Sequence, residues 1–128
     1  MSIARLLALF GMLLCLLAPA YGEAPDLDKV RDLTLKRELK ALDEAATVLE
    51  GVNDEASAKK AIIKLNNTFR QIPPTVHFAN QQVLEIWAKA QNRVSFQMWR
   101  LKDEPYFEKL KFQELWTLIS DPFSRPTR

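Results

Sequence analysis

The sequence contains very little cysteine, glycine and histidine, and each scarcity excludes a class of protein. Its 128 residues include one cysteine, three glycines and one histidine. A single cysteine cannot form an intramolecular disulfide, so the fold depends on packing. Phosphate-binding loops need several closely spaced glycines, whereas the glycines here stand at positions 11, 22 and 51. Nucleotide-binding folds built on such loops are therefore excluded.

The single histidine also limits the chemistry that the chain can perform. His77 has no cysteine beside it and no spaced pair of carboxylates, whereas metal sites usually need three or four converging ligands. A hydrolase triad would have to be assembled around the same residue. Adjacent acids such as Asp43 and Glu44 point in different directions on a helix and are typical of a charged surface. We therefore predict a non-enzymatic protein without a metal or cofactor.

The charges are nearly balanced, with 18 basic and 16 acidic residues. A nucleic-acid-binding surface would show clustered basic charge, which this sequence lacks. We predict no nucleic-acid partner.

The first 22 residues have the order of a cleavable secretory signal peptide. Arg5 supplies a positive charge, residues 6–17 are apolar, and small residues follow at 18, 20 and 22. The apolar run is about 12 residues long, and a bilayer span needs about 20. Leu14 before Cys15 does not fit a lipoprotein cleavage box. We predict cleavage after Ala20 or Gly22, export to the periplasm or the medium, and a mature form that does not span a membrane.

After the signal, the sequence shows helical periodicity in four stretches. In residues 26–50 the apolar residues recur every three or four positions, as on one face of a helix. This stripe consists of Leu35, Leu39, Leu42, Ala46 and Leu49. The same spacing predicts helices over residues 54–72, 75–102 and 104–120, within a helical domain of residues 23–121. The predicted fold is all-α, a four-helix bundle or an irregular array of two helical hairpins. A signal peptide helix precedes it and a flexible tail, residues 122–128, follows.

Local signals predict where these helices begin and end. Gly51 should stop the first helix in the left-handed conformation that glycine adopts easily. Asn53 or Asp54 should cap the second helix, and Thr75 the third. Pro105 fits the first turn of the fourth.

The second half of the chain has more aromatic residues than one helical stripe needs. Phe96 and Trp99 fall opposite the main stripe of the third helix, and the fourth helix has apolar residues on two sides. One interpretation is that the fourth helix folds back over the third, so that both faces are core. The other is that Phe96, Trp99 and Tyr106 form a contact site for a protein partner or a second copy.

Two functional hypotheses follow. The first is an exported, non-enzymatic helical protein that acts through protein contacts. The alternative is a periplasmic carrier of a small apolar ligand bound between helices. The residues that would line the carrier site are Trp87, Met98, Phe112 and Trp116.

Two segments resemble a hairpin of small exported bacterial helical-bundle proteins of unassigned function. They are Leu49-x-x-Val52-x-Asp54-x-x-Ser57-Ala58-Lys59-x-Ala61-x-x-x-Leu65 and Arg100-Leu101-x-x-x-Pro105. The resemblance implies an exported compartment and a helical fold, with no activity attached. The first hairpin also looks like that of a periplasmic b-type cytochrome bundle. That family has a methionine near the start of its first helix and a histidine near the end of its last, both absent here, so haem is not expected.

Overall fold

The computed structural model describes residues 25–73 and 80–126, and every regular element in these two ranges is helical. The elements are the 3-10 turn η2 (Leu27–Lys29), the helices α2 (Leu33–Glu50), α3 (Glu55–Arg70), α4 (Gln81–Leu101), α5 (Pro105–Lys109) and α6 (Phe112–Ser120), and the 3-10 turn η3 (Pro122–Ser124). Five α-helices without a strand in the described ranges confirm the all-α class. The predicted signal peptide, Thr75 and His77 lie outside the described residues.

Helix α2 begins at Leu33, seven residues later than the sequence predicts, because Asp32 caps it there. Residues Leu27–Lys29 form a separate 3-10 turn, and the Asp32 carboxylate accepts the N–H of Leu35 at 2.9 Å. An aspartate in this position supplies an acceptor for an N–H that the first turn leaves unpaired. The predicted stripe of α2 is confirmed, since all its members are buried: Leu35, Leu39, Leu42, Ala46 and Leu49.

In the turn between α2 and α3, the predicted cap is confirmed but the predicted backbone conformation of the glycine is not. Gly51 has φ −80° and ψ −4°, which is right-handed backbone, so the expectation of a left-handed glycine is wrong. The second helix is capped by Asp54, as one of the two predicted candidates. Its carboxylate accepts the N–H of Ser57 at 2.7 Å, while the Ser57 hydroxyl accepts the N–H of Asp54 at 3.2 Å. This reciprocal pair is a capping box.

Helix α4 begins at Gln81 and not at residue 75, where the sequence places its start. The Asn80 side chain accepts the N–H of Val83 at 2.9 Å and so acts as the cap. Asparagine is among the best capping residues because its short side chain reaches the free N–H groups of the first turn.

The single helix predicted over residues 104–120 is two helices in the structure, α5 and α6. Lys111 separates them with φ 62° and ψ 45°, the only non-glycine residue with positive φ in the described part of the chain. A continuous helix would hold its two apolar sides apart. The break lets Tyr106 in α5 and Phe112 and Leu115 in α6 all be buried.

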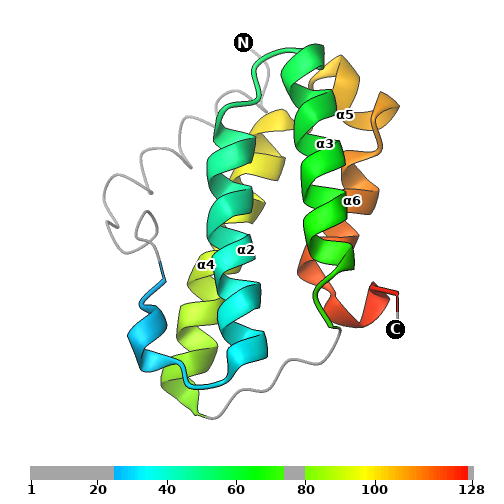
Figure 1. The fold of residues 1–128 in the computed structure, drawn as a ribbon. Coiled ribbons are helices and arrows are strands. Elements are labelled where there is room, and N and C mark those ends of the chain that lie inside the picture. The colour runs from blue at the N-terminus through cyan, green and yellow to red at the C-terminus, as the bar shows by residue number, and fades with distance from the viewer. Residues whose placement is uncertain (1–24, 74–79, 127–128) are drawn as a thin grey trace, which may run out of the picture.

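The helices form two side-by-side pairs (Figure 1). Helices α2 and α4 make the most extensive contact, and α3 lies against α6. Arg93 in α4 pairs with Asp43 in α2, and Arg100 near the end of α4 reaches Leu49 near the end of α2. Corresponding parts of α2 and α4 therefore lie together, so the two helices run parallel. In the described residues, no helix is both long and apolar enough to cross a membrane.

The chain after α6 is held against the other helices over the part that the structure describes. The sequence predicts a flexible tail from residue 122, whereas Pro122–Ser124 forms a 3-10 turn and Arg125 is 2% exposed. The turn is capped by Asp121, whose carboxylate accepts the N–H of Phe123 at 3.1 Å. The burial of Arg125 results from an ion pair that connects distant parts of the sequence, described below.

Candidate functional site

Phe96 and Trp99 lie three residues apart on α4, so they are neighbours on the helix surface. The buried face of α4 consists of Val83, Ala90, Gln91, Val94, Met98 and Leu101. Neither Phe96 nor Trp99 belongs to this face, and both are partly exposed. We call these two residues the α4 aromatic surface. The structure therefore brings together two of the three predicted contact residues.

A lysine borders the α4 aromatic surface. The Lys102 ammonium lies over the Trp99 ring, 4.9 Å from its centroid. A cation over an indole face contributes about 0.5–1 kcal/mol at an exposed site. The contact places a positive charge at the border of the surface.

The third predicted contact residue, Tyr106, is placed in the core. It is 8% exposed, and its ring centroid lies 6.3 Å from that of Phe112. Burial, followed by the nearby Glu104 carboxylate, raises the pKa of the Tyr106 hydroxyl. The sequence placed this residue near a hinge, but it gave no means of knowing that the break at Lys111 would turn α5 inward.

The residues of the carrier hypothesis contribute to the packed interior. Met98 and Phe112 are buried, and Trp87 and Trp116 are partly buried and pack against the core. None of the four lines either of the two surface hollows described next. Within the described residues, these four side chains therefore take part in packing and line neither hollow.

Two surface hollows flank α3, and both are lined mainly by polar and charged side chains. One, of about 440 Å³, lies between α2 and α3. The other, of about 480 Å³, lies between α3 and α6. Their basic residues are Arg37, Lys40, Lys64, Arg70 and Lys111. Lys64 is paired with Glu44 at 3.1 Å. These hollows were not foreseen, since they depend on how three helices meet.

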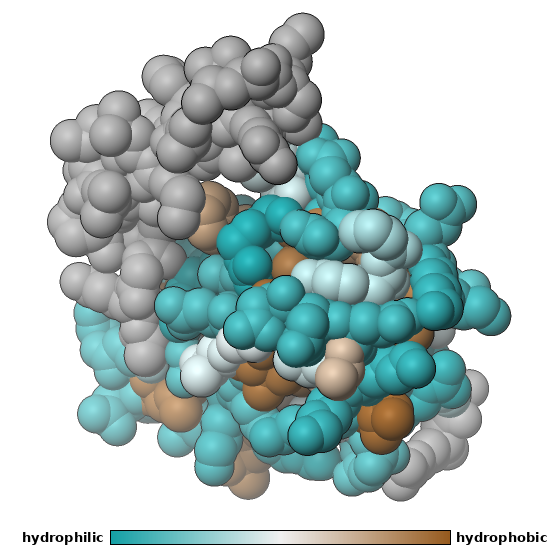
Figure 2. All heavy atoms as spheres, turned by 90° about the horizontal axis from the view of Figure 1, so that it is seen from above, coloured by the Kyte–Doolittle hydropathy of each residue, from teal (hydrophilic) through white to brown (hydrophobic). Residues whose placement is uncertain are grey.

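Exposed apolar side chains are scattered on the described surface. The large ones are Leu33, Ile63, Leu84 and Phe123. Seen from the end that carries the α2–α3 turn, the surface is mostly hydrophilic and its hydrophobic residues form small separate patches (Figure 2). Single exposed apolar residues are normal for a folded protein.

A buried polar cluster is the main feature that sequence reasoning missed. Its side chains come from Glu38 on α2, Gln91 on α4 and Arg125 after η3, and they are 0%, 7% and 2% exposed. The sequence held one signal for it, because Glu38 lies three residues after Leu35 and four before Leu42, on the apolar stripe. A charged residue at such a position needs a buried partner.

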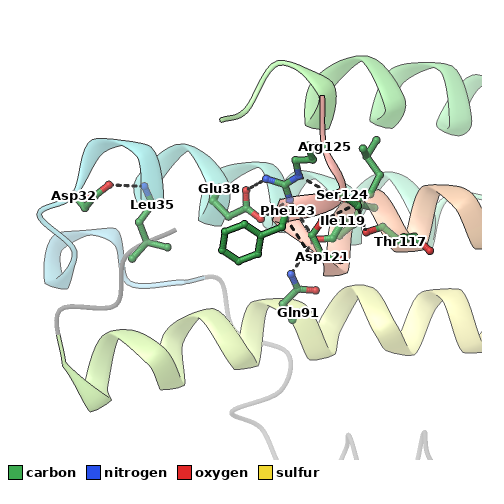
Figure 3. Close-up of polar contacts among 11 residues, drawn as sticks. Asp32, Leu35, Glu38, Gln91, Thr117, Ile119, Asp121, Phe123, Ser124 and Arg125 are labelled. Atoms are coloured by element: carbon green, nitrogen blue, oxygen red, sulfur yellow. Dashed lines mark hydrogen bonds and ion pairs between the residues drawn. The ribbon is translucent and has the colours of Figure 1, made fainter. Parts of the chain in front are cut away.

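Figure 3 shows how the cluster is joined. Arg125 donates from Nη1 and Nη2 to the two Glu38 carboxylate oxygens, at 2.5 and 2.6 Å. The Gln91 Nε2 donates to the Ile119 carbonyl at 3.0 Å. Helices α2, α4 and α6 therefore meet at one polar point through residues far apart in the sequence.

The described residues contain no cluster of three or more histidine, cysteine, aspartate or glutamate side chains that could hold a metal ion. Comparisons of the chain with models of protein families, with curated proteins and with solved structures found no match.

Proposed function

We propose that the protein is an exported, non-enzymatic helical protein that acts by binding another protein or a second copy of itself through the α4 aromatic surface. The observation that supports this proposal is the partial exposure of Phe96 and Trp99 on α4, outside its buried face. Aromatic residues, tryptophan above all, contribute much of the binding energy where proteins meet.

Site-specific photo-crosslinking tests the contact. A benzoylphenylalanine replaces Phe96 in the full chain expressed in cells, and the matched control carries it at Phe123, which is 79% exposed. We expect a crosslinked product from position 96 and none from position 123, because exposure alone does not make a contact. The product should disappear when Trp99→Ala is added. Its mass distinguishes a second copy from a different protein.

Two results would contradict the proposal. One is the absence of any product at position 96, and the other is an equal product at both positions. The carrier alternative has its own readout, since Trp87 and Trp116 pack against the core. An apolar ligand bound beside them would change tryptophan fluorescence in the Trp99→Ala variant as much as in the unchanged chain.

Export rests on residues 1–22 and is tested separately. Mass spectrometry of the mature protein should find an N-terminus at Tyr21 or Glu23, corresponding to cleavage after Ala20 or Gly22. A product that keeps Met1 and stays in the membrane fraction would refute the signal peptide.

A further inference from the structure

The guanidinium of Arg125 is held in the interior of the bundle on all the sides that the structure describes. Besides its two bonds to Glu38, it donates from Nε to the Leu118 carbonyl at 2.8 Å and from Nη2 to the Ile119 carbonyl at 3.2 Å. Its central carbon lies 5.1 Å from the centroid of the Phe69 ring. The side chains of Glu38 and Arg125 are both 0% exposed.

The groups that accept hydrogen bonds from this guanidinium or pack against it all belong to helices. Glu38 is on α2, Phe69 on α3, and the two carbonyls are in the last turn of α6. Carbonyls in the last turn have no N–H partner within the helix and lie at its negative end. The helices therefore form an anionic cleft with an aromatic wall, and only its occupant comes from the segment after α6.

The geometry of the cleft fits a planar guanidinium better than a compact ammonium group. The two Glu38 oxygens accept two parallel N–H bonds, which is the bidentate arrangement that guanidinium makes and ammonium cannot. The aromatic face of Phe69 suits the same flat group.

A second polar side chain, Gln91, shares the Ile119 carbonyl with Arg125. The Oε1 atom of Gln91 is buried and has no hydrogen-bond partner in the described part of the chain. It belongs to the side chain whose Nε2 already bonds the Ile119 carbonyl. A buried acceptor without a donor costs free energy, and such atoms are rare in folded proteins.

We propose that this cleft is a guanidinium-binding site, occupied here by the chain's own Arg125, which acts as a tethered ligand. When Arg125 is removed, the site accepts an alkylguanidinium such as the arginine side chain of another molecule. The proposal does not depend on the α4 aromatic surface.

Ligand rescue of the full chain carrying Arg125→Ala tests the site. The probe is ethylguanidinium chloride at about 10 mM, too dilute to denature, with ethylammonium chloride at equal ionic strength as the comparison. Thermal unfolding is followed by circular dichroism. We expect ethylguanidinium to raise the Tm of the variant by about 4 °C or more, as a ligand at several times its Kd does in a domain of this size. Ethylammonium should raise it much less.

Three other chains should give no such response. In the unchanged chain Arg125 already fills the site. Arg70→Ala removes an arginine that is exposed on the surface and leaves the cleft occupied. The double variant Glu38→Leu/Arg125→Met replaces the ion pair by apolar side chains, and it should fold without binding the probe.

The proposal is overturned if ethylguanidinium and ethylammonium raise the Tm of Arg125→Ala equally, or if ethylguanidinium raises the Tm of Arg125→Ala no more than it raises that of the unchanged chain. If Arg125→Ala is unfolded without ligand, ethylguanidinium should restore its helical circular-dichroism signal. Failure to restore that signal would also overturn the proposal. Restoration by ethylguanidinium alone supports the site.

Discussion

Two short junctions between helices are stabilised by different kinds of contact. The junction from Gly51 to Asp54 is held by hydrogen bonds among neighbours in the sequence, through the Asp54 and Ser57 capping box. The junction at Lys111 has left-handed backbone, and the helix that follows has no side-chain cap. It is held by packing, since Phe107 stacks on Phe112 with ring centroids 5.4 Å apart. The first junction can therefore form locally, whereas the second requires the assembled core.

We expect the largest loss of stability from a substitution that disrupts the packing at the second junction. Phe112→Ala removes a ring that is 0% exposed and that both Tyr106 and Phe107 contact. We expect the free energy of unfolding to fall by about 3–5 kcal/mol, from lost burial and the cavity left behind. Urea denaturation measures it. Phe123→Ala is the control, because that ring is 79% exposed, and a similar loss there would contradict the argument.

The first junction also receives one long-range contact, from Arg100 on α4. This side chain donates to the Leu49 carbonyl at 2.7 Å and to the Val52 carbonyl at 3.2 Å. Arg100→Met should lower the free energy of unfolding by about 1.5–3 kcal/mol, since two carbonyls lose a charged donor. Lys89→Met, at an exposed position of the same helix, should change it by less than about 0.5 kcal/mol. Equal values for the two variants would show that the contact contributes nothing.

The capping box makes the first junction sensitive to acid. The hydrogen bond from Ser57 holds the pKa of Asp54 below its ordinary value. A lowered folded-state pKa gives a contribution that is present above the unfolded pKa and is lost as the pH falls through the folded one. Asp54→Ala should lower the Tm by about 4–8 °C at neutral pH.

This difference in Tm should shrink below about pH 4, where the carboxylate of the unchanged chain takes up a proton. Thermal scans across this pH range provide the measurement. Asp103→Ala is the control, because Asp103 is exposed and caps no helix. A difference between Asp54→Ala and the unchanged chain that stays constant down to pH 2 would contradict the role of the charged carboxylate.

A smaller change in stability is expected from substitutions at Lys111, whose φ is 62°. Left-handed backbone is unfavourable for a residue with a β-carbon, so Lys111→Gly should raise the free energy of unfolding by about 1 kcal/mol. Lys111→Ala keeps the β-carbon and should bring no gain. If denaturation gave both variants the same stability, the left-handed geometry would not be the cause.

The smallest effect concerns Gly51, whose backbone is right-handed. A β-carbon added there would meet the Val48 carbonyl oxygen at 3.5 Å, an ordinary contact. Gly51→Ala should therefore raise the free energy of unfolding by about 0.5 kcal/mol, because it restricts the unfolded chain. A loss of more than about 1 kcal/mol would mean that this junction needs a glycine after all.

The elements that could be predicted from the sequence are those stabilised by local contacts, and the elements that were missed depend on long-range contacts. The stripe of α2 and the cap at Asp54 were predicted because they depend on residues three or four positions apart. The break at Lys111 was missed, although the two-sided apolar pattern of residues 104–120 was visible. The pattern indicates surplus apolar surface, but it does not say whether the helix breaks or a partner covers it.

The candidate site was predicted in part for the same reason. Helical spacing put Phe96 and Trp99 on one surface, and the structure leaves both partly exposed. Tyr106 was included because it lies near the predicted hinge, and the break turned it into the core. Glu38 was visible as a charge on an apolar stripe, but nothing near it identified Arg125 as its partner.

The sequence alone determined that the described chain is helical and where the turn between α2 and α3 falls, because periodicity and capping act over a few residues. Only the tertiary structure decided that α2 lies along the parallel α4, that Lys111 takes left-handed backbone, and that Arg125 is buried against Glu38. That ion pair joins residues 87 positions apart. No local pattern specifies such a contact, because it forms only when packing removes both charges from water and brings them together.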